Sequence, residues 1–134
     1  FVDTDLEIVK KTGKSIEEIF ETGNELIFRN YESSVITAIG KKTNQIIATG
    51  GGAVTIQKNK AALRQNSVVV FIERALSELE TNGRPLSKTV DLDFMYKKRL
   101  PLYEDFSDIT IEVMETPEKT AQKILDALKN IKRV

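Results

Sequence analysis

An apolar run that ends in three consecutive glycines constrains the fold of this chain more than any other feature. The segment Ile46-Ile47-Ala48 is followed, after Thr49, by Gly50-Gly51-Gly52. This pattern predicts a strand from Gln45 to Thr49 that ends in backbone without side chains, which a ligand can approach closely. Ligands of open α/β sheets bind at such strand ends. A tight strand-to-helix turn without a ligand explains a triple glycine equally well, so the rest of the chain decides between them.

The composition excludes several kinds of chemistry. The chain has 134 residues, which suits one compact domain spanning 1–134. Its 20 basic and 20 acidic residues cancel, so no overall field favours nucleic acid or an anionic membrane, and an anion site must be local. Cysteine and histidine are absent, which excludes disulfides, thiolate nucleophiles, zinc fingers and an imidazole base. Acid–base chemistry would fall to carboxylates or lysine.

The sequence also carries expectations about location and context. No apolar run approaches the ~20 residues that cross a bilayer, and no signal-peptide pattern is present, so we expect a cytoplasmic protein without membrane contact. The chain opens at Phe1 without an initiator methionine, as if inside a strand. We therefore expect part of a longer polypeptide, which is compatible with fusion to another enzyme. No exposed apolar stripe stands out, so we expect a monomer.

The first half of the chain reads as three helices before the glycine strand. A short helix after Asp3-Thr4-Asp5 is closed by Gly13, and Ser15 with Glu18 forms a capping box that starts a second helix. A longer helix runs from about Glu25 to Ile39. The residues expected to point inward are Ile16, Ile19 and Phe20 in the second helix and Leu26, Val35, Ile36 and Ile39 in the third.

The second half alternates strands and helices. The unbroken apolar run 68–72 predicts a strand covered on both faces, as in a parallel sheet. The further elements expected are a helix over 59–64, a short helix around Leu76 and Leu79, an exposed and mobile lid over 81–90, a helix over 92–102, a strand over 109–113 and a helix from Thr116-Pro117 to Ile131. This order predicts an α/β domain whose parallel sheet is flanked by helices.

Two aspartates lie at the end of the first expected strand. Asp3 and Asp5 are two residues apart, so in an extended segment they would project from the same face. Such a pair can divide its work, with one carboxylate accepting a proton or holding the water shell of a metal and the other binding hydroxyls. Helix capping by either aspartate is the ordinary alternative.

Three arginines are candidates for anion recognition, because guanidinium groups bind carboxylate and phosphate through two hydrogen bonds. Arg29 follows Phe28 and would lie near an apolar wall. Arg84 precedes Pro85 in the expected lid, where closure could bring positive charge onto a transferring phosphate. Arg99 ends the basic row Lys97-Lys98-Arg99, which a solvated helix face explains equally well.

Gly13-Lys14-Ser15 superficially matches the end of a phosphate-binding loop. That motif needs a glycine five residues before Gly13, where Ile8 stands, and a preceding strand, where the pattern predicts helix. Ser15 is better explained as a helix cap. The 134 residues therefore contain no nucleotide-phosphate loop.

Six ordered blocks of the sequence resemble shikimate kinase, and the likeness is collinear over nearly the whole chain. The blocks are Phe1-Val2-Asp3-Thr4-Asp5, Gly13-Lys14-Ser15-Ile16-Glu17-Glu18-Ile19-Phe20, Phe28-Arg29-Asn30-Tyr31-Glu32, Ala48-Thr49-Gly50-Gly51-Gly52-Ala53-Val54, Gly83-Arg84-Pro85-Leu86 and Arg99-Leu100-Pro101-Leu102-Tyr103. The resemblance implies a three-layer P-loop NTPase-like fold of the nucleoside-monophosphate-kinase type. It also implies transfer of the γ-phosphate of ATP to the 3-hydroxyl of shikimate with Mg²⁺, a step in chorismate and aromatic amino acid biosynthesis.

The resemblance further implies roles for charged residues. Asp5 would bind shikimate hydroxyls, and Asp3 would be catalytic, near the metal through water and near the attacking hydroxyl. Arg29 and Arg99 would hold the shikimate carboxylate, and Glu32 would orient Arg29. These roles agree with what an anionic, polyhydroxylated substrate requires.

The same resemblance assigns the remaining site residues. Gly50, Gly51 and Gly52 would supply closely approaching backbone, and Phe20 and Phe28 would wall the substrate ring. Arg84 would close from the lid onto the phosphates of ATP, as both a catalytic and a nucleotide-binding residue.

Two departures from the family pattern stand out. Family members carry a glycine-rich loop ending in Gly-Lys-Ser/Thr before the Asp-x-Asp segment, so we expect the first strand and this loop to be absent from the 134 residues. The lid is also short and holds no second arginine before Arg84. Two other hypotheses stay open: a relative of gluconate or nucleotide kinases, and a shikimate-binding domain without catalytic activity.

Overall fold

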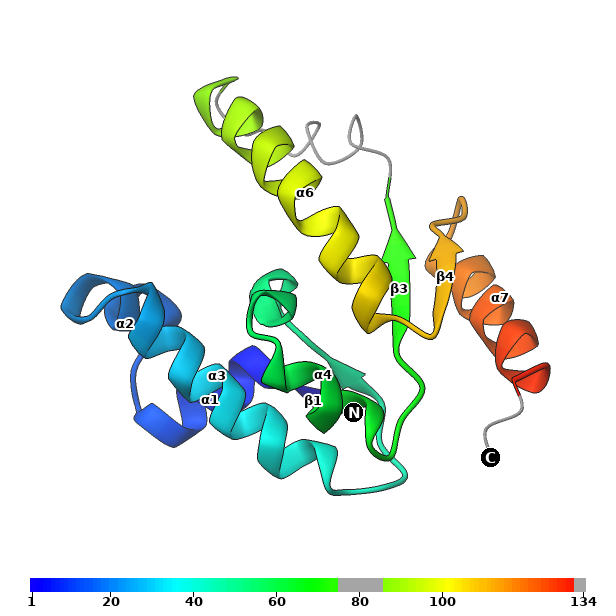
Figure 1. Cartoon of the computed structure of the whole chain (residues 1–134), viewed down its shortest axis with the longest axis horizontal. Helices are drawn as coiled ribbons and strands as arrows, with labels where there is room; N and C mark the ends of the chain where they lie inside the picture. The colour runs from blue at the N-terminus through cyan, green and yellow to red at the C-terminus, as the bar shows by residue number, and fades with distance from the viewer. Residues whose placement is uncertain (75–85, 132–134) are drawn as a thin grey trace. The chain divides into compact units, whose positions relative to one another are not determined.

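The computed structural model describes residues 1–74 and 86–131, with side chains described for 1–74 and 94–131. The chain divides into two compact units, Phe1–Ser67 and Val68–Val134, and each is described by itself (Figure 1). None of the described helices is both long enough and apolar enough to cross a bilayer.

The first unit is built on two short parallel strands. Its elements are β1 (Val2–Asp3), α1 (Thr4–Thr12), α2 (Ile16–Thr22), α3 (Glu25–Gly40), β2 (Ile47–Ala48), the 3₁₀ turn η1 (Gly51–Thr55) and α4 (Lys58–Arg64). Val2 pairs with Ile47 and Asp3 with Ala48. The strand before the glycines is confirmed, although it is shorter than predicted. Because parallel strands end at the same edge, the start of α1 and the glycine segment lie together.

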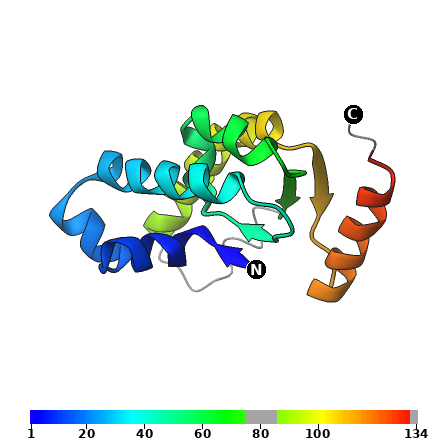
Figure 2. The same ribbon diagram turned by 90° about the horizontal axis from the view of Figure 1, so that it is seen from below.

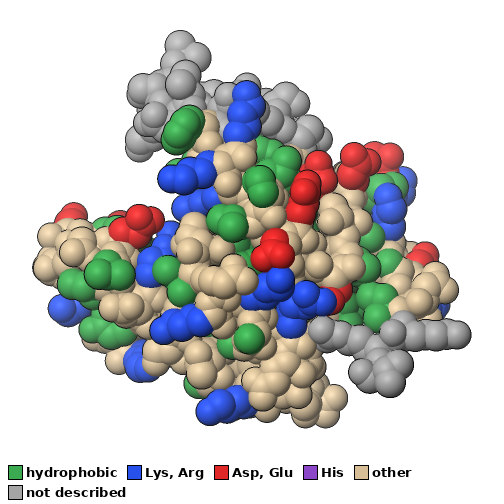
Figure 3. Space-filling view, viewed as in Figure 1, with side chains coloured by type: hydrophobic (Ala, Val, Ile, Leu, Met, Phe, Trp, Pro, Cys, Tyr) green, Lys and Arg blue, Asp and Glu red, His purple; other side chains and the backbone are tan. Residues whose placement is uncertain are grey.

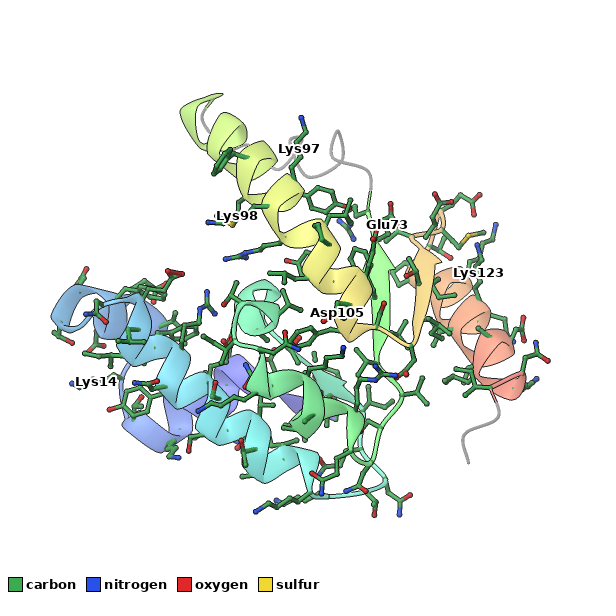
Figure 4. All side chains as sticks on the ribbon, in the orientation of Figure 1. Lys14, Glu73, Lys97, Lys98, Asp105 and Lys123 are labelled. Atoms are coloured by element: carbon green, nitrogen blue, oxygen red, sulfur yellow. The ribbon has the colours of Figure 1, made fainter. Side chains whose placement is uncertain are left out.

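The predicted helix ends of this unit are confirmed. Gly13 closes α1 with φ +70, a left-handed conformation that favours glycine. Ser15 accepts from the backbone N–H of Glu18, whose carboxylate in turn accepts from the N–H of Ser15, so the capping box is formed. Lys14 lies between the two caps as an exposed loop residue (Figure 4). The Gly13-Lys14-Ser15 segment is therefore a helix–helix junction.

The core of the first unit lies among α1, α2 and α3 (Figure 2). Its buried members are Ile8, Ile19, Phe28, Val35 and Ile39, with Val2, Ile16 and Ile47 packed against them. Two expectations were wrong: Leu26 is 64% exposed and Phe20 is 42% exposed. Leu26 lies two residues from Phe28, about 200° around the helix, so a face that buries Phe28 turns Leu26 outward.

The second unit holds a second parallel strand pair. Its described elements are β3 (Val70–Glu73), α6 (Leu86–Phe106), β4 (Ile109–Glu112) and α7 (Pro117–Lys129). Val70 pairs with Ile109, and the register continues to Glu73 and Glu112. The Asp108 carboxylate accepts from the backbone N–H of Val69 at 2.7 Å, which fixes the start of the pair.

Four predictions for the second unit need correction or concern residues that the structure does not fully describe. Helix α6 is longer than the predicted 92–102 and continues past Pro101, which removes one backbone donor without ending the helix. Ile72 is 48% exposed, so the described residues do not bury β3 on both faces. The short helix around Leu76 and Leu79 falls outside the described residues. Of the predicted lid, 81–85 also falls outside, whereas 86–90 is the first part of α6.

The final helix is anchored to β4 as its cap predicts. Thr116 caps α7 by accepting from the N–H of Lys119, with Pro117 in the first helical position. The Thr120 hydroxyl accepts from the backbone N–H of Met114 at 2.9 Å and donates to the carbonyl of Thr116. This buried hydroxyl joins the end of β4 to the first turn of α7.

Candidate functional site

The candidate site begins where β1 ends. The Oδ1 atom of Asp3 accepts from the backbone N–H of Asp5 at 2.9 Å and of Leu6 at 3.4 Å, so Asp3 is the N-cap of α1. Asp5 lies in the first turn of this helix. The expectation of two aspartates on one face of an extended segment was therefore wrong, because the strand turns into helix between them. Capping, the ordinary alternative, is confirmed for Asp3.

The environment of Asp5 changes the pKa of its carboxyl group. Burial raises the pKa of Asp5 above its ordinary value, the negative charge of Asp3 adds to the rise, and Arg29 opposes it. Its Oδ1 atom is buried and finds no hydrogen-bond partner among the described residues. A buried carboxylate oxygen without a donor is costly unless a ligand supplies one. Asp5 is thus the side chain of this unit best placed to accept from a ligand hydroxyl.

Gly50 brings two carboxylates together over bare backbone. A Cβ atom added at Gly50 would lie 3.2 Å from Oδ1 of Asp5 and 3.4 Å from Oε2 of Glu32. These contacts are tighter than most side chains make, so the missing side chain lets both acidic groups approach β2. Helices α1 and α3 each contribute one of them, and the glycine segment lies where they meet.

Arg29 is fixed by its own helix. Its Nη1 donates to Oε1 of Glu32 at 2.8 Å, and its Nη2 lies 3.4 Å from Oε1 of Glu25. Its side chain is 11% exposed and that of Glu32 is fully buried, whereas that of Glu25 is 64% exposed. The guanidinium carbon also lies 5.1 Å from the centre of the Phe28 ring, within cation–π range. Arg29 is therefore held in one orientation before any ligand arrives.

Gly52 leaves open the space that the Arg29 guanidinium group occupies, and this space is called the seat of Arg29. A Cβ atom added at Gly52 would overlap this group. The bare backbone of the triple glycine is thus occupied at this position by a side chain of the protein itself, which the sequence pattern did not reveal. Any larger residue at 52 would have to displace Arg29.

Phe20 and Phe28 form an aromatic pair beside these charges. Their ring centres are 5.0 Å apart at an angle of 32°. Phe28 is 5% exposed and belongs to the core, while Phe20 keeps 42% of its surface exposed. The pair gives the first unit an apolar surface with one accessible ring, next to the Arg29 guanidinium.

The structure places most of the predicted site residues in one unit. The residues of the first unit are Asp3, Asp5, Phe20, Phe28, Arg29, Glu32, Gly50, Gly51 and Gly52. Arg99 is half-buried on α6 in the second unit, and Arg84 lies outside the described residues. Lys97 and Lys98 are exposed and project from α6 (Figure 4). Two residues escaped the sequence analysis: Glu25, the second partner of Arg29, and Asn59, which is buried beside the glycine turn.

The electrostatic balance of the first-unit site is negative. Glu25 and Glu32 pair with Arg29, and Asp5 feels the charges of both Arg29 and Asp3, so the described site holds four carboxyl groups and one guanidinium group. Elsewhere, Lys and Arg side chains are interspersed with Asp and Glu side chains on the face drawn in Figure 3. An anionic ligand at this site would therefore require further positive charge besides that of Arg29.

Comparison with known proteins gives one consistent family. The family model for shikimate kinase matches residues 1–129. A shikimate kinase from Parasynechococcus marenigrum is 39% identical over 141 residues, covering 98% of this chain and 73% of the relative. One from Burkholderia lata is 38% identical over 121 residues, covering 84% of this chain and 66% of the relative. The chain thus spans about two thirds to three quarters of the length of these curated relatives.

Solved structures agree with the sequence comparison. A shikimate kinase from Acinetobacter baumannii in complex with shikimate has a TM-score of 0.90 and 32% identity, covering 98% of this chain and 80% of the solved one. A shikimate kinase from Aquifex aeolicus has a TM-score of 0.81 and 28% identity, covering 96% of this chain and 80% of the solved one. These likenesses confirm the predicted α/β fold of the P-loop NTPase type.

Proposed function

This chain belongs to the shikimate kinase family, whose members are ATP-dependent phosphotransferases, and we propose that it forms the acceptor-binding part of such an enzyme. The reaction is transfer of the γ-phosphate of ATP to the 3-hydroxyl of shikimate, in aromatic amino acid biosynthesis. The observation that carries the proposal is the fixed guanidinium of Arg29, seated on Gly52 and paired with buried Glu32. A cation held in this way is suited to a ligand carboxylate.

The acidic residues complete the recognition of a hydroxylated acid. The unpartnered Oδ1 of Asp5 accepts from an acceptor hydroxyl. Asp3 lies beside it at the end of β1, close enough for its charge to raise the pKa of Asp5. We propose that Asp3 accepts the proton of the attacking hydroxyl, the general-base role that phosphoryl transfer allows.

The excess of carboxyl groups at this site suggests roles for Arg84 and Arg99. With four carboxyl groups and one described guanidinium group at this site, the substrate carboxylate and the phosphates of ATP need additional cations. Arg99 shares the substrate carboxylate with Arg29, and Arg84 brings positive charge to the transferring phosphate. Both roles are proposals, supported by the family membership and by the excess of carboxyl groups around Arg29.

Mg²⁺ fits the carboxyl groups that are present. Among the described residues no group of three or more acidic side chains could hold a metal alone. Mg²⁺ in kinase sites is bound by one or two carboxylates together with waters and substrate phosphates. The cap of α1 uses Oδ1 of Asp3, so Oδ2 can face a hydrated cation. When bound, Mg²⁺ neutralises phosphate charge during transfer.

The aromatic pair and the glycines form the walls of the proposed acceptor site. Phe20 presents the exposed ring of the pair to the substrate, while Phe28 supports both Phe20 and the Arg29 guanidinium. Backbone at Gly50 and Gly51 approaches the substrate, and Gly52 serves Arg29. A cytoplasmic location and a monomeric state belong to the same proposal.

The test is a coupled assay of the intact protein with ATP, Mg²⁺ and shikimate. We expect phosphorylation of shikimate, and a loss of about 10- to 100-fold in kcat/KM for Arg29→Lys and Arg99→Ala, as for removal of charge-assisted hydrogen bonds. Lys98→Ala, on the exposed face of α6, is the matched control and keeps wild-type activity. Ordinary activity of Arg99→Ala would refute the assignment of Arg99.

The same assay separates the other hypotheses. Phosphorylation of gluconate or of a nucleotide, with shikimate ignored, would indicate a different acceptor on the same fold. Binding of shikimate by calorimetry without turnover in the intact protein would indicate an inactive shikimate-binding domain. Either result would overturn the proposed function.

A further inference from the structure

We propose that Asn59 is a positioning residue of the acceptor site, because it holds the 3₁₀ turn on which the glycine segment and the seat of Arg29 depend. This inference rests on the proposed function for its substrate. Asn59 lies in α4, and its described hydrogen bond goes to Ala53 in the turn η1. Its action is therefore through the turn η1.

The amide of Asn59 has one described hydrogen bond, and it goes to the turn. Asn59 is fully buried, and its Nδ2 donates to the backbone carbonyl of Ala53 at 2.9 Å. A carbonyl oxygen only accepts, so the nitrogen side of the amide must face Ala53. The Oδ1 atom finds no partner among the described residues. Burying an amide is costly, and the contact with Ala53 is what compensates that cost.

Helix α4 is itself fixed on α3, so Asn59 has a rigid base. A Cβ atom added at Gly40, the last residue of α3, would overlap the backbone carbonyl of Ala62 in α4. The two helices therefore pack backbone against backbone at this point. A side chain on α4 cannot move relative to α3 without opening this contact.

The turn η1 also contacts a residue in the first half of α3. Arg29, eleven residues before Gly40 in α3, covers Gly52 with its guanidinium group. The turn is thus contacted by Arg29 of α3 at Gly52 and by Asn59 of α4 at Ala53, and these two helices pack against each other. Two further hydrogen bonds close the turn: the Ala53 N–H donates to the Gly50 carbonyl at 3.2 Å, and the Thr55 hydroxyl donates to the Gly52 carbonyl. Glycine-rich backbone loses much entropy on ordering, so it needs such external support.

Loss of the Asn59 donor should therefore act on acceptor binding. If η1 relaxes, the seat of Arg29 shifts, and with it the guanidinium proposed to bind the substrate carboxylate. Nucleotide binding has no such dependence, because none of these residues is proposed to contact ATP. The expected signature is a raised KM for shikimate with an unchanged KM for ATP.

The test compares Asn59→Asp with Asn66→Asp in the intact protein. Asp is nearly isosteric with Asn but cannot donate when ionised, so it leaves the Ala53 carbonyl without its partner. Asn66 is the matched control, because its Nδ2 also donates to backbone carbonyls, those of Gly40 and Lys41 at 3.2 Å, but it does not contact the turn. Asn59→Ala, which adds no charge, checks that the effect comes from the lost donor.

Two measurements are made on each variant. The first is backbone amide hydrogen exchange of 51–55 without substrate, and the second is steady-state kinetics. We expect Asn59→Asp and Asn59→Ala to exchange faster at 51–55 and to raise the shikimate KM about 10-fold, with the ATP KM within twofold of wild type. Asn66→Asp should change neither quantity.

The outcomes separate this inference from the proposed function. Unchanged exchange at 51–55, or a shikimate KM that stays at the wild-type value while exchange rises, overturns the positioning role. Equal increases in both KM values also overturn it, because they indicate general loosening of the fold. If the wild-type protein does not phosphorylate shikimate, the proposed function fails, and the exchange contrast still decides whether Asn59 holds the turn.

Discussion

The guanidinium group of Arg29 occupies the space that a side chain at residue 52 would need. Residue 52 must therefore be glycine for Arg29 to keep this position. The backbone at Gly52 packs against the cation on which the proposed site most depends. Glu32 fixes it from the side through a 2.8 Å ion pair.

Gly52→Ala should displace Arg29 and weaken acceptor recognition. We expect kcat/KM for shikimate to fall about 10- to 100-fold, the effect of losing one or two charge-assisted hydrogen bonds, with the ATP KM unchanged. Gly13→Ala is the control glycine, since its φ of +70 makes alanine strained by about 1–2 kcal/mol, but nothing lies within 4 Å of an added Cβ. A Gly52→Ala variant with normal shikimate kinetics would contradict the seat assigned here.

Glu32→Ala should destabilise the fold strongly. Removing one member of a buried ion pair leaves an uncompensated charge and costs about 3–5 kcal/mol. Glu25→Ala removes the other carboxylate that contacts Arg29, but this group is 64% exposed, so we expect a change of at most about 1 kcal/mol. Urea denaturation measures the free energy of unfolding of the two variants. If both variants lose a similar amount of stability, the difference in burial between Glu32 and Glu25 does not determine the effect.

Asp5→Asn should stabilise the protein at neutral pH while impairing activity. Because burial and the charge of Asp3 raise the pKa of Asp5, the folded state binds this proton more tightly than the unfolded state. Ionisation of Asp5 therefore lowers stability as the pH rises through and above its ordinary value of 3.8. The variant should have a higher Tm than wild type at neutral pH, and the difference should vanish as the pH falls below that value.

Thermal scans over pH check this prediction, with Glu21→Gln on the exposed side of α2 as the control for loss of one negative charge. A Tm difference that grows toward acid pH would give the opposite sign and refute it. Activity is measured in parallel, since Asp5 is proposed to bind a hydroxyl.

Thr120→Val should loosen the junction between β4 and α7. The partly buried backbone N–H of Met114 loses its hydroxyl acceptor, which costs about 1 kcal/mol. Amide exchange at Met114 should accelerate correspondingly. Thr110→Val, the same substitution at an exposed position of β4, should leave both stability and exchange nearly unchanged.

The fold could be predicted from the sequence wherever local chemistry determines structure. Ser15, Gly13 and Thr116 mark helix ends because capping depends on only a few neighbouring residues. Packing depends on distant residues and was predicted less well, as Leu26 shows. The length of α6 was also missed, since proline removes one donor but does not by itself end a helix.

The candidate site shows the same division. Asp5 and Arg29 are residue types whose chemistry is visible in the sequence, and the role of Glu32 beside Arg29 was implied by the family resemblance; their i, i+3 spacing on a helix is compatible with the observed pair. The meeting of Asp5 with Gly50 and of Arg29 with Gly52 is a tertiary contact that no local pattern encodes. Asn59 carries no sequence signal either, because asparagine is common on helix surfaces and only its burial distinguishes it.

The capping of α1 by Asp3 has a consequence for substrate choice. Two backbone amides donate to Oδ1 of Asp3, and Asp5, which is proposed to bind a substrate hydroxyl, lies in the helical turn that they begin. Stereoisomers of the acceptor would present their hydroxyls at different positions to these two carboxylates. Selection among them would then depend on backbone hydrogen bonds at the first turn of α1.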